Sequence, residues 1–79
     1  MAPKQILDII HYIKNGQKPN LVIESRKHAE PLAIALFESK CLYDLLHTDA
    51  SLNDITEQIS RKNKAARYYF EVTGNKWPF

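Results

Sequence analysis

The sequence predicts an all-α fold, a small bundle of three to four helices. Apolar residues recur at intervals of three and four over three long segments, which is the spacing that lines one face of a helix. With 79 residues the chain can build one hydrophobic core and not two. Its composition, 44% hydrophobic and 25% charged, is that of a globular protein. We therefore expect a single helical domain over residues 1–79, with an extended tail over residues 73–79.

The first helix is expected over residues 3–15. Its apolar face is made of four isoleucines, Ile6, Ile9, Ile10 and Ile13. Pro3 suits the first turn, because its missing N–H would have no partner there. Gly16 suits the left-handed position that ends a helix, so that residues 16–20 form a turn or loop.

Residues Leu21, Val22 and Ile23 fit either a short strand or the start of a helix capped by Asn20. A helix is the better interpretation, because a lone three-residue strand finds no partner elsewhere in this sequence to satisfy its backbone groups. Pro31 is then expected to break or kink the chain before the next helix.

The central helix is expected from about Pro31 to His47. Its apolar residues cover most of the helix circumference, which predicts the most buried helix of the bundle. These residues are Leu32, Ile34, Leu36, Phe37, Cys41, Leu42, Leu45 and Leu46. Cys41, the only cysteine, is therefore expected to be a buried thiol in a reducing compartment. Residues 48–51 form the turn that follows.

The last long segment admits two interpretations. It is either one continuous amphipathic helix to about Thr73, ended by Gly74, or a helix that stops near Ser60 and a second that begins around Lys64. The second interpretation is a helix-turn-helix. Both share the same start, because Ser51 opens a sequence close to a capping box. The apolar positions of this segment are Leu52, Ile55, Ile59, Ala66, Tyr69 and Phe70.

The sequence offers no grouping of residues that would support catalysis, so we expect no enzyme, no metal and no cofactor. The three histidines, His11, His28 and His47, lie in separate segments without metal-ligand spacing. Cys41 and His47 form the only cysteine–histidine pair, and their six-residue separation places them about 120° from being superposed on a helix. Two glycines are too few for a phosphate-binding loop.

No apolar run approaches the roughly 18 residues that a membrane span needs, and the first residues lack the features of a secretory signal. Together with the lone cysteine, these observations lead us to expect a cytoplasmic protein that needs no membrane and takes no small-molecule substrate.

Charge is unevenly placed along the chain, although its net value is only +2. Between residues 38 and 57 five acids accompany a single base, Lys40. The next segment reverses this balance and interleaves bases with aromatic residues. Its bases are Arg61, Lys62, Lys64 and Arg67, and its rings are Tyr68, Tyr69 and Phe70. Such residues suit phosphate contacts and are also the favoured anchors of protein interfaces.

Residues 54–70 resemble the core of a helix-turn-helix DNA-binding unit. Ile55 and Ile59 match the apolar positions of its first helix, and Ala66 and Phe70 match those of its second. In that family the second helix enters the major groove, which implies that the DNA-binding residues are Lys62, Asn63, Lys64 and Arg67. The sequence departs from the pattern at two specific positions. Thr56 stands where a small alanine is usual, and Ser60 stands where a turn glycine is common.

In size, charge and helical content the chain also resembles short accessory proteins of phages and mobile elements, such as antirepressors. That resemblance implies a non-enzymatic regulatory protein that binds and inhibits or modulates a protein partner, such as a repressor or another transcription regulator. This is the function we expect from the sequence. The alternative is a small helix-turn-helix DNA-binding transcription regulator.

We expect a homodimer, because a 79-residue monomer has difficulty covering this many apolar and aromatic side chains. The expected partner-binding residues combine aromatic anchors with bases that steer the encounter. They are Arg61, Lys64, Arg67, Tyr68, Tyr69, Trp77 and Phe79, with Tyr12 as an outside candidate.

Overall fold

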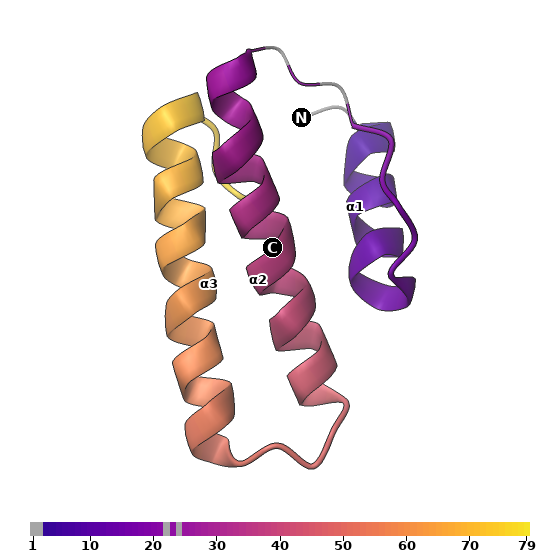
Figure 1. The fold of residues 1–79 in the computed structure, drawn as a ribbon, viewed down its shortest axis with the longest axis vertical. Helices are drawn as coiled ribbons and strands as arrows, with labels where there is room; N and C mark the ends of the chain where they lie inside the picture. Colours follow the sequence, from indigo (N-terminus) through magenta and orange to yellow (C-terminus); the bar gives the residue numbers. More distant parts are fainter. Residues whose placement is uncertain (1–2, 22, 24) are drawn as a thin grey trace.

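The computed structural model describes residues 3–21, 23 and 25–79, and within them the fold is all-α, as predicted. Helix α1 spans Pro3–Asn15, α2 spans Ala29–Leu46 and α3 spans Leu52–Thr73, and a short 3-10 helix, η1, spans Arg26–His28. Figure 1 shows α2 and α3 side by side as a long antiparallel pair, with α1 on the other side of α2. Helix α2 is therefore the central helix of the bundle.

The end of α1 and both ends of α3 follow the sequence signals. Ser51 caps α3, because its Oγ accepts a hydrogen bond from the backbone N–H of Asp54 at 3.1 Å. Both glycines adopt the left-handed conformation, Gly16 with φ 72° and Gly74 with φ 76°. Their backbone N–H groups donate 2.8 Å bonds to the carbonyls of Tyr12 and Phe70 respectively, which ends α1 and α3 as predicted.

Two predictions about the region before α2 were wrong. Leu21 and Ile23 lie outside any helix, and Val22 lies outside the described residues. The central helix begins at Ala29, before Pro31, instead of being broken there. Pro31 sits in the first turn of α2, where a missing N–H costs nothing, and its side chain is buried.

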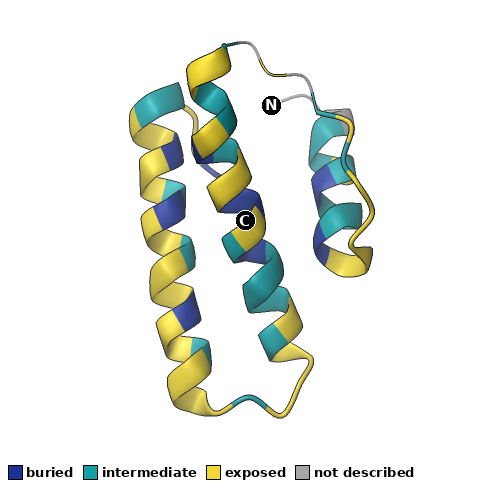
Figure 2. Cartoon of the chain, in the orientation of Figure 1, coloured by how far each residue is buried: buried dark blue, intermediate teal, exposed yellow. Residues whose placement is uncertain are grey.

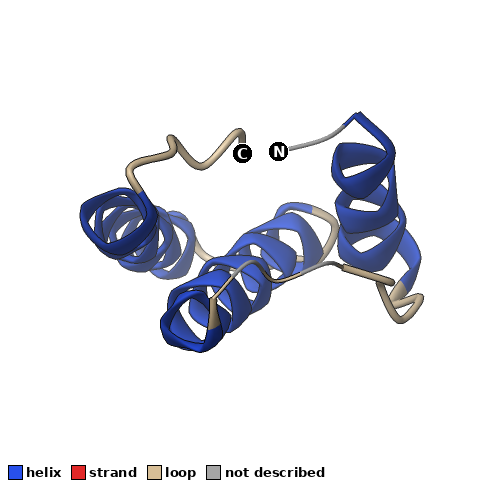
Figure 3. Ribbon diagram, turned by 90° about the horizontal axis from the view of Figure 1, so that it is seen from above, coloured by secondary structure: helices blue, strands red, loops and turns tan. Residues whose placement is uncertain are grey.

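The hydrophobic core lies where α1, α2, α3 and the C-terminal tail (residues 75–79) meet. Seen from above, the tail leaves α3 and runs over the α2–α3 pair towards the side where α1 lies (Figure 3). The buried cluster consists of Ile9, Ile13, Ala35, Leu36, Ala65, Tyr69 and Trp77. The tail thus contributes to the core, although it has no regular secondary structure.

Helices α2 and α3 are also joined by a buried polar contact. The side chain of Gln58 is buried, and its amide nitrogen donates to the backbone carbonyl of Glu38 at 3.0 Å and to the Glu38 carboxylate at 3.2 Å. Because a buried amide without partners would be costly, this contact favours one relative position of the two helices. No feature of the sequence had indicated a buried glutamine.

The bundle is thin, which leaves much of each helix uncovered. It measures 38 × 25 × 17 Å along its principal axes, and a helix with its side chains is about 10–12 Å across. Figure 2 shows buried residues confined to the inner sides of the helices, with most of α3 exposed. Helix α2 is the central helix, as predicted, but not all of its apolar residues are covered: Phe37 is 59% exposed and Leu46 is 57% exposed.

Candidate functional site

The long helix α3 decides between the two interpretations of the last segment. It is continuous from Leu52 to Thr73, with no turn between Ser60 and Lys64. The helix-turn-helix prediction was wrong, because nothing in residues 60–64 breaks a helix and the apolar spacing continues through them. The four residues assigned to a recognition helix therefore lie along a single helix. Lys62 is directed elsewhere, since its Nζ donates to the backbone carbonyl of Phe79 at 2.8 Å.

Three of the predicted partner-binding residues belong to the core instead. Tyr69 is 6% exposed and Trp77 is 8% exposed, with their rings edge to face at 5.2 Å between centroids. Phe79 is partly buried and packs edge to face on Trp77 at 5.7 Å. Trp77 Nε1 donates to Ser39 Oγ at 2.9 Å in the interior. Tyr69 and Trp77 are therefore not free anchors, because the tail folds back and buries them.

The remaining predicted residues are exposed, but they do not share one face. Arg61, Lys64 and Tyr68 are separated by three and four residues, so they lie on the same side of α3. Arg67 is exposed on another side of the helix, and Asn63 lies on that other side too. The outside candidate Tyr12 is half-buried at the end of α1, where Lys40 Nζ lies 5.8 Å from its ring centre.

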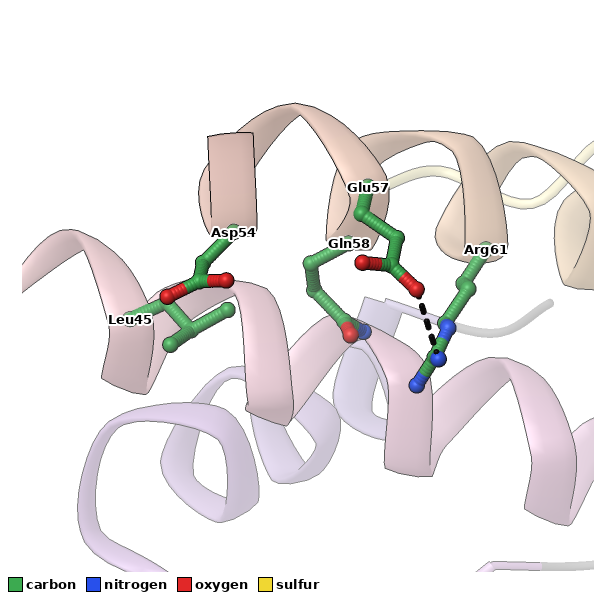
Figure 4. Close-up of a pocket in the computed structure, with 5 residues that line it drawn as sticks. All are labelled: Leu45, Asp54, Glu57, Gln58 and Arg61. Carbon is green, nitrogen blue, oxygen red and sulfur yellow. Dashed lines mark hydrogen bonds and ion pairs between the residues drawn. The ribbon is translucent and has the colours of Figure 1, made fainter. Parts of the chain in front are cut away.

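Arg61 faces a hollow between α2 and α3. The hollow has a volume of about 200 Å³, and it is lined by Leu45, Asp54, Glu57, Gln58 and Arg61. Figure 4 shows α1 behind the two helices, so the hollow opens on the face of the α2–α3 pair away from α1. Arg61 is paired with Glu57 at 2.9 Å, and both side chains are more than half exposed. An exposed pair of this kind contributes little to stability, so the guanidinium remains available to a partner.

The same face carries an uncovered apolar stripe on α2. Ile34, Phe37 and Cys41 are spaced by three and four residues, and Leu45 of the hollow continues the series. Phe37 is 59% exposed and Ile34 is 37% exposed. Their apolar character had predicted that these residues are covered in the bundle. The exposed charges at Glu30 and Asp44 on neighbouring positions of α2 were the signal that this side of the helix faces solvent.

Cys41 does not have the environment of a nucleophile. Its thiol is half-buried, not buried as predicted. Desolvation raises the pKa of Cys41, and the carboxylates of Glu38 and Asp44 raise it further, against the opposing effects of Lys40 and Arg61. His47 contacts Tyr43: its Nδ1 donates to the Tyr43 carbonyl at 2.8 Å, and its ring lies on the Tyr43 ring.

We therefore expect Cys41 to react slowly with thiol reagents. The raised pKa lowers the thiolate fraction below that of an unfolded chain at every pH below the folded-state pKa, and the thiolate is the reacting form. The alkylation rate at mildly alkaline pH should be several-fold lower for the folded protein than for the protein in urea. Equal rates in both states, measured with the same reagent, would contradict the raised pKa.

Other kinds of site are not formed by the described part of the chain. Within residues 3–21, 23 and 25–79, no three His, Cys, Asp or Glu side chains lie close enough together to hold a metal ion. Among the same residues no helix is both long and apolar enough to cross a membrane. The features with functional potential in the described residues are exposed surfaces, not an enclosed cavity.

Comparison with protein-family models, with curated proteins and with solved structures gave no significant match.

Proposed function

We propose that the protein is a non-enzymatic regulatory protein that acts by binding a protein partner. The binding surface is the side of the α2–α3 pair that faces away from α1, and we call it the binding face. It consists of Ile34, Phe37, Cys41, Arg61, Lys64 and Tyr68. The observation that carries the proposal is Phe37, an aromatic side chain that is 59% exposed near the middle of a long helix.

The chemistry of the binding face favours a protein as the partner. Exposed aromatic and aliphatic side chains beside an arginine are the combination that anchors protein interfaces. Phe37 and Ile34 supply apolar area, and Tyr68 supplies a ring with a polar tip. Arg61 and Lys64 add positive charge at the edge, where charge mainly sets orientation and association rate. A purely electrostatic contact with nucleic acid would leave Phe37 without a role.

The resemblance to phage and mobile-element accessory proteins suggests the class of partner. We propose a repressor or another transcription regulator, whose activity the protein modulates by covering part of its surface. Covering a surface needs no catalytic group on this chain.

The substitution Phe37→Glu tests the proposal. Because Phe37 is exposed, the substitution should change the free energy of unfolding by no more than about 0.5 kcal/mol. A charge placed in the centre of an apolar contact should weaken partner binding at least about tenfold. The first measurement is affinity capture from cell extract, with the wild-type chain and each variant as bait. Every protein that the wild-type chain retains and the Phe37→Glu chain loses is then purified, and its affinity for both chains is measured by titration calorimetry.

Leu7→Glu is the matched control. Leu7 is 52% exposed, close to the value for Phe37, but it lies on α1 and outside the binding face. The Leu7→Glu bait should retain the partners of the binding face. The wild-type bait should also retain them from extract that has been treated with nuclease. A set of captured proteins that is the same for all three baits would overturn the proposal. Loss of every captured protein after nuclease treatment would support nucleic acid binding instead.

A further inference from the structure

Helix α3 carries a second, uncharged surface on a side away from the binding face, exposed except at Ala66, which is partly buried against the core. Its residues follow one another at alternating intervals of four and three, the spacing of a heptad repeat. We call this surface the α3 seam, and it consists of Leu52, Thr56, Ile59, Asn63, Ala66 and Phe70. Leu52 is 78% exposed, Phe70 is 47% exposed and Ile59 is 42% exposed. The buried residues Gln58, Ala65 and Tyr69 belong to a different side of the same helix.

The α3 seam contains no charged residue, although α3 has seven of them. They are Asp54, Glu57, Arg61, Lys62, Lys64, Arg67 and Glu71. All seven lie at other positions around the helix, and Lys62, the nearest on one side, directs its ammonium group to the Phe79 carbonyl. A side of an exposed helix that excludes charge over five turns is typical of a helix that packs against another helix.

The sequence of the α3 seam is complementary to itself when two copies run antiparallel. In antiparallel helix pairs the two kinds of heptad core position face each other. A twofold axis on the seam side of α3, level with residue 61, places Leu52 opposite Phe70 of the second copy, because both lie nine residues from that level. In the same register Ile59 lies opposite the second copy's Asn63.

Each layer of that register matches in size. Two large apolar residues, Leu52 and Phe70, meet at both ends of the contact. Two small residues, Thr56 and Ala66, meet in the layers between, and Ile59 with Asn63 flanks the axis. At one edge of the contact, Ser60 of the two copies meet near the axis. At the other edge the two Lys62 residues meet, and each ammonium group donates to the Phe79 carbonyl of its own chain. A parallel pairing would instead place Asn63 against Asn63 and Leu52 against Leu52.

We propose that the protein forms a twofold symmetric homodimer through the α3 seam, with the two α3 helices antiparallel. The contact runs from Leu52 to Phe70, about 27 Å at 1.5 Å per residue. It lies beside an apolar hollow of about 180 Å³ that is lined by residues including Leu46 and Phe79. A standard interface covers roughly 800 Å² per subunit, about one seventh of the 5643 Å² monomer surface, and this is the area that a stable dimer would have to cover.

Sedimentation equilibrium of the full chain tests the dimer. We expect the wild-type protein to sediment at twice the 9.2 kDa chain mass. Ile59→Glu and Leu52→Glu, both at exposed positions, should each lower the association constant at least about tenfold without loss of helical circular dichroism. Asn63→Leu should raise the association constant of the dimer, because an apolar residue replaces the only amide of the α3 seam. The matched control is Phe37→Glu, which should leave the mass unchanged.

Thiol cross-linking tests the antiparallel register. In a Cys41→Ala background, a mixture of the Leu52→Cys and Phe70→Cys proteins should form cross-linked dimers with a short bis-thiol reagent. Neither protein alone should do so, because its two thiols would lie about 27 Å apart along the helix axis. Cross-linking of Leu52→Cys with itself would show a parallel pair and overturn the proposal. A wild-type monomer at the highest soluble concentration, or a dimer insensitive to Ile59→Glu and Leu52→Glu, would also overturn it.

Discussion

Replacing Trp77 with alanine is expected to lower the free energy of unfolding by about 3–5 kcal/mol, the range observed for removal of a buried aromatic side chain. Trp77 is 8% exposed and touches the rings of Tyr69 and Phe79. Its loss opens a cavity between the tail and the α2–α3 pair and leaves Ser39 Oγ without its indole donor. A chain of this length has a total stability of roughly 4–12 kcal/mol, so the variant should be partly or largely unfolded.

Urea unfolding followed by circular dichroism measures this loss. Lys76→Ala is the matched control, because Lys76 is the exposed neighbour of Trp77 in the same tail and should change stability by no more than about 0.5 kcal/mol. Ser39→Ala, which removes only the hydroxyl partner of the indole, should cost about 1–3 kcal/mol. If Trp77→Ala unfolded at the same urea concentration as Lys76→Ala, the tail would not be part of the core.

Replacing Ile9 with alanine is expected to cost about 2–5 kcal/mol, because Ile9 is completely buried. It lies on α1 within the same core cluster as Leu36 of α2. The cavity left by its side chain would weaken the packing of α1 on α2. Since each kcal/mol lowers the melting temperature of a domain this size by about 4–8 °C, a fall of at least about 8 °C is expected.

Thermal unfolding at 222 nm measures this shift, and Leu7→Ala provides the comparison. Leu7 lies two residues away on the same helix but is 52% exposed, so its truncation removes little buried area. Similar melting temperatures for the Ile9→Ala and Leu7→Ala proteins would mean that α1 does not pack on α2 through its isoleucine face.

The two proposed surfaces can be occupied together. The binding face uses Arg61, Lys64 and Tyr68 on α3, whereas the α3 seam uses positions on a different side of the helix, such as Ile59 and Phe70. Phe37→Glu and Ile59→Glu therefore separate the two activities: each substitution should impair one and leave the other. In the proposed dimer the binding face is present twice, which would strengthen attachment to a symmetric partner without any new contact.

The sequence by itself determined the three long helices and the local signals that end α1 and flank α3, but not where α2 begins. Local interactions are sufficient for that, since Ser51 and the two glycines act on the backbone within a few residues of their own positions. The continuity of α3 is also local, because residues 60–64 lack any helix breaker. The helix-turn-helix prediction was wrong at residues 60–64, where α3 continues without a turn.

Only the tertiary structure decided which apolar side chains are covered. Trp77 and Phe37 are both large aromatic residues, yet Trp77 is 8% exposed and Phe37 is 59% exposed. The difference arises because the tail folds back onto the α2–α3 pair on one side, whereas no segment among the described residues covers the other side. That fold-back depends on contacts between residues far apart in sequence, such as Trp77 with Ser39, and helical periodicity carries no information about them.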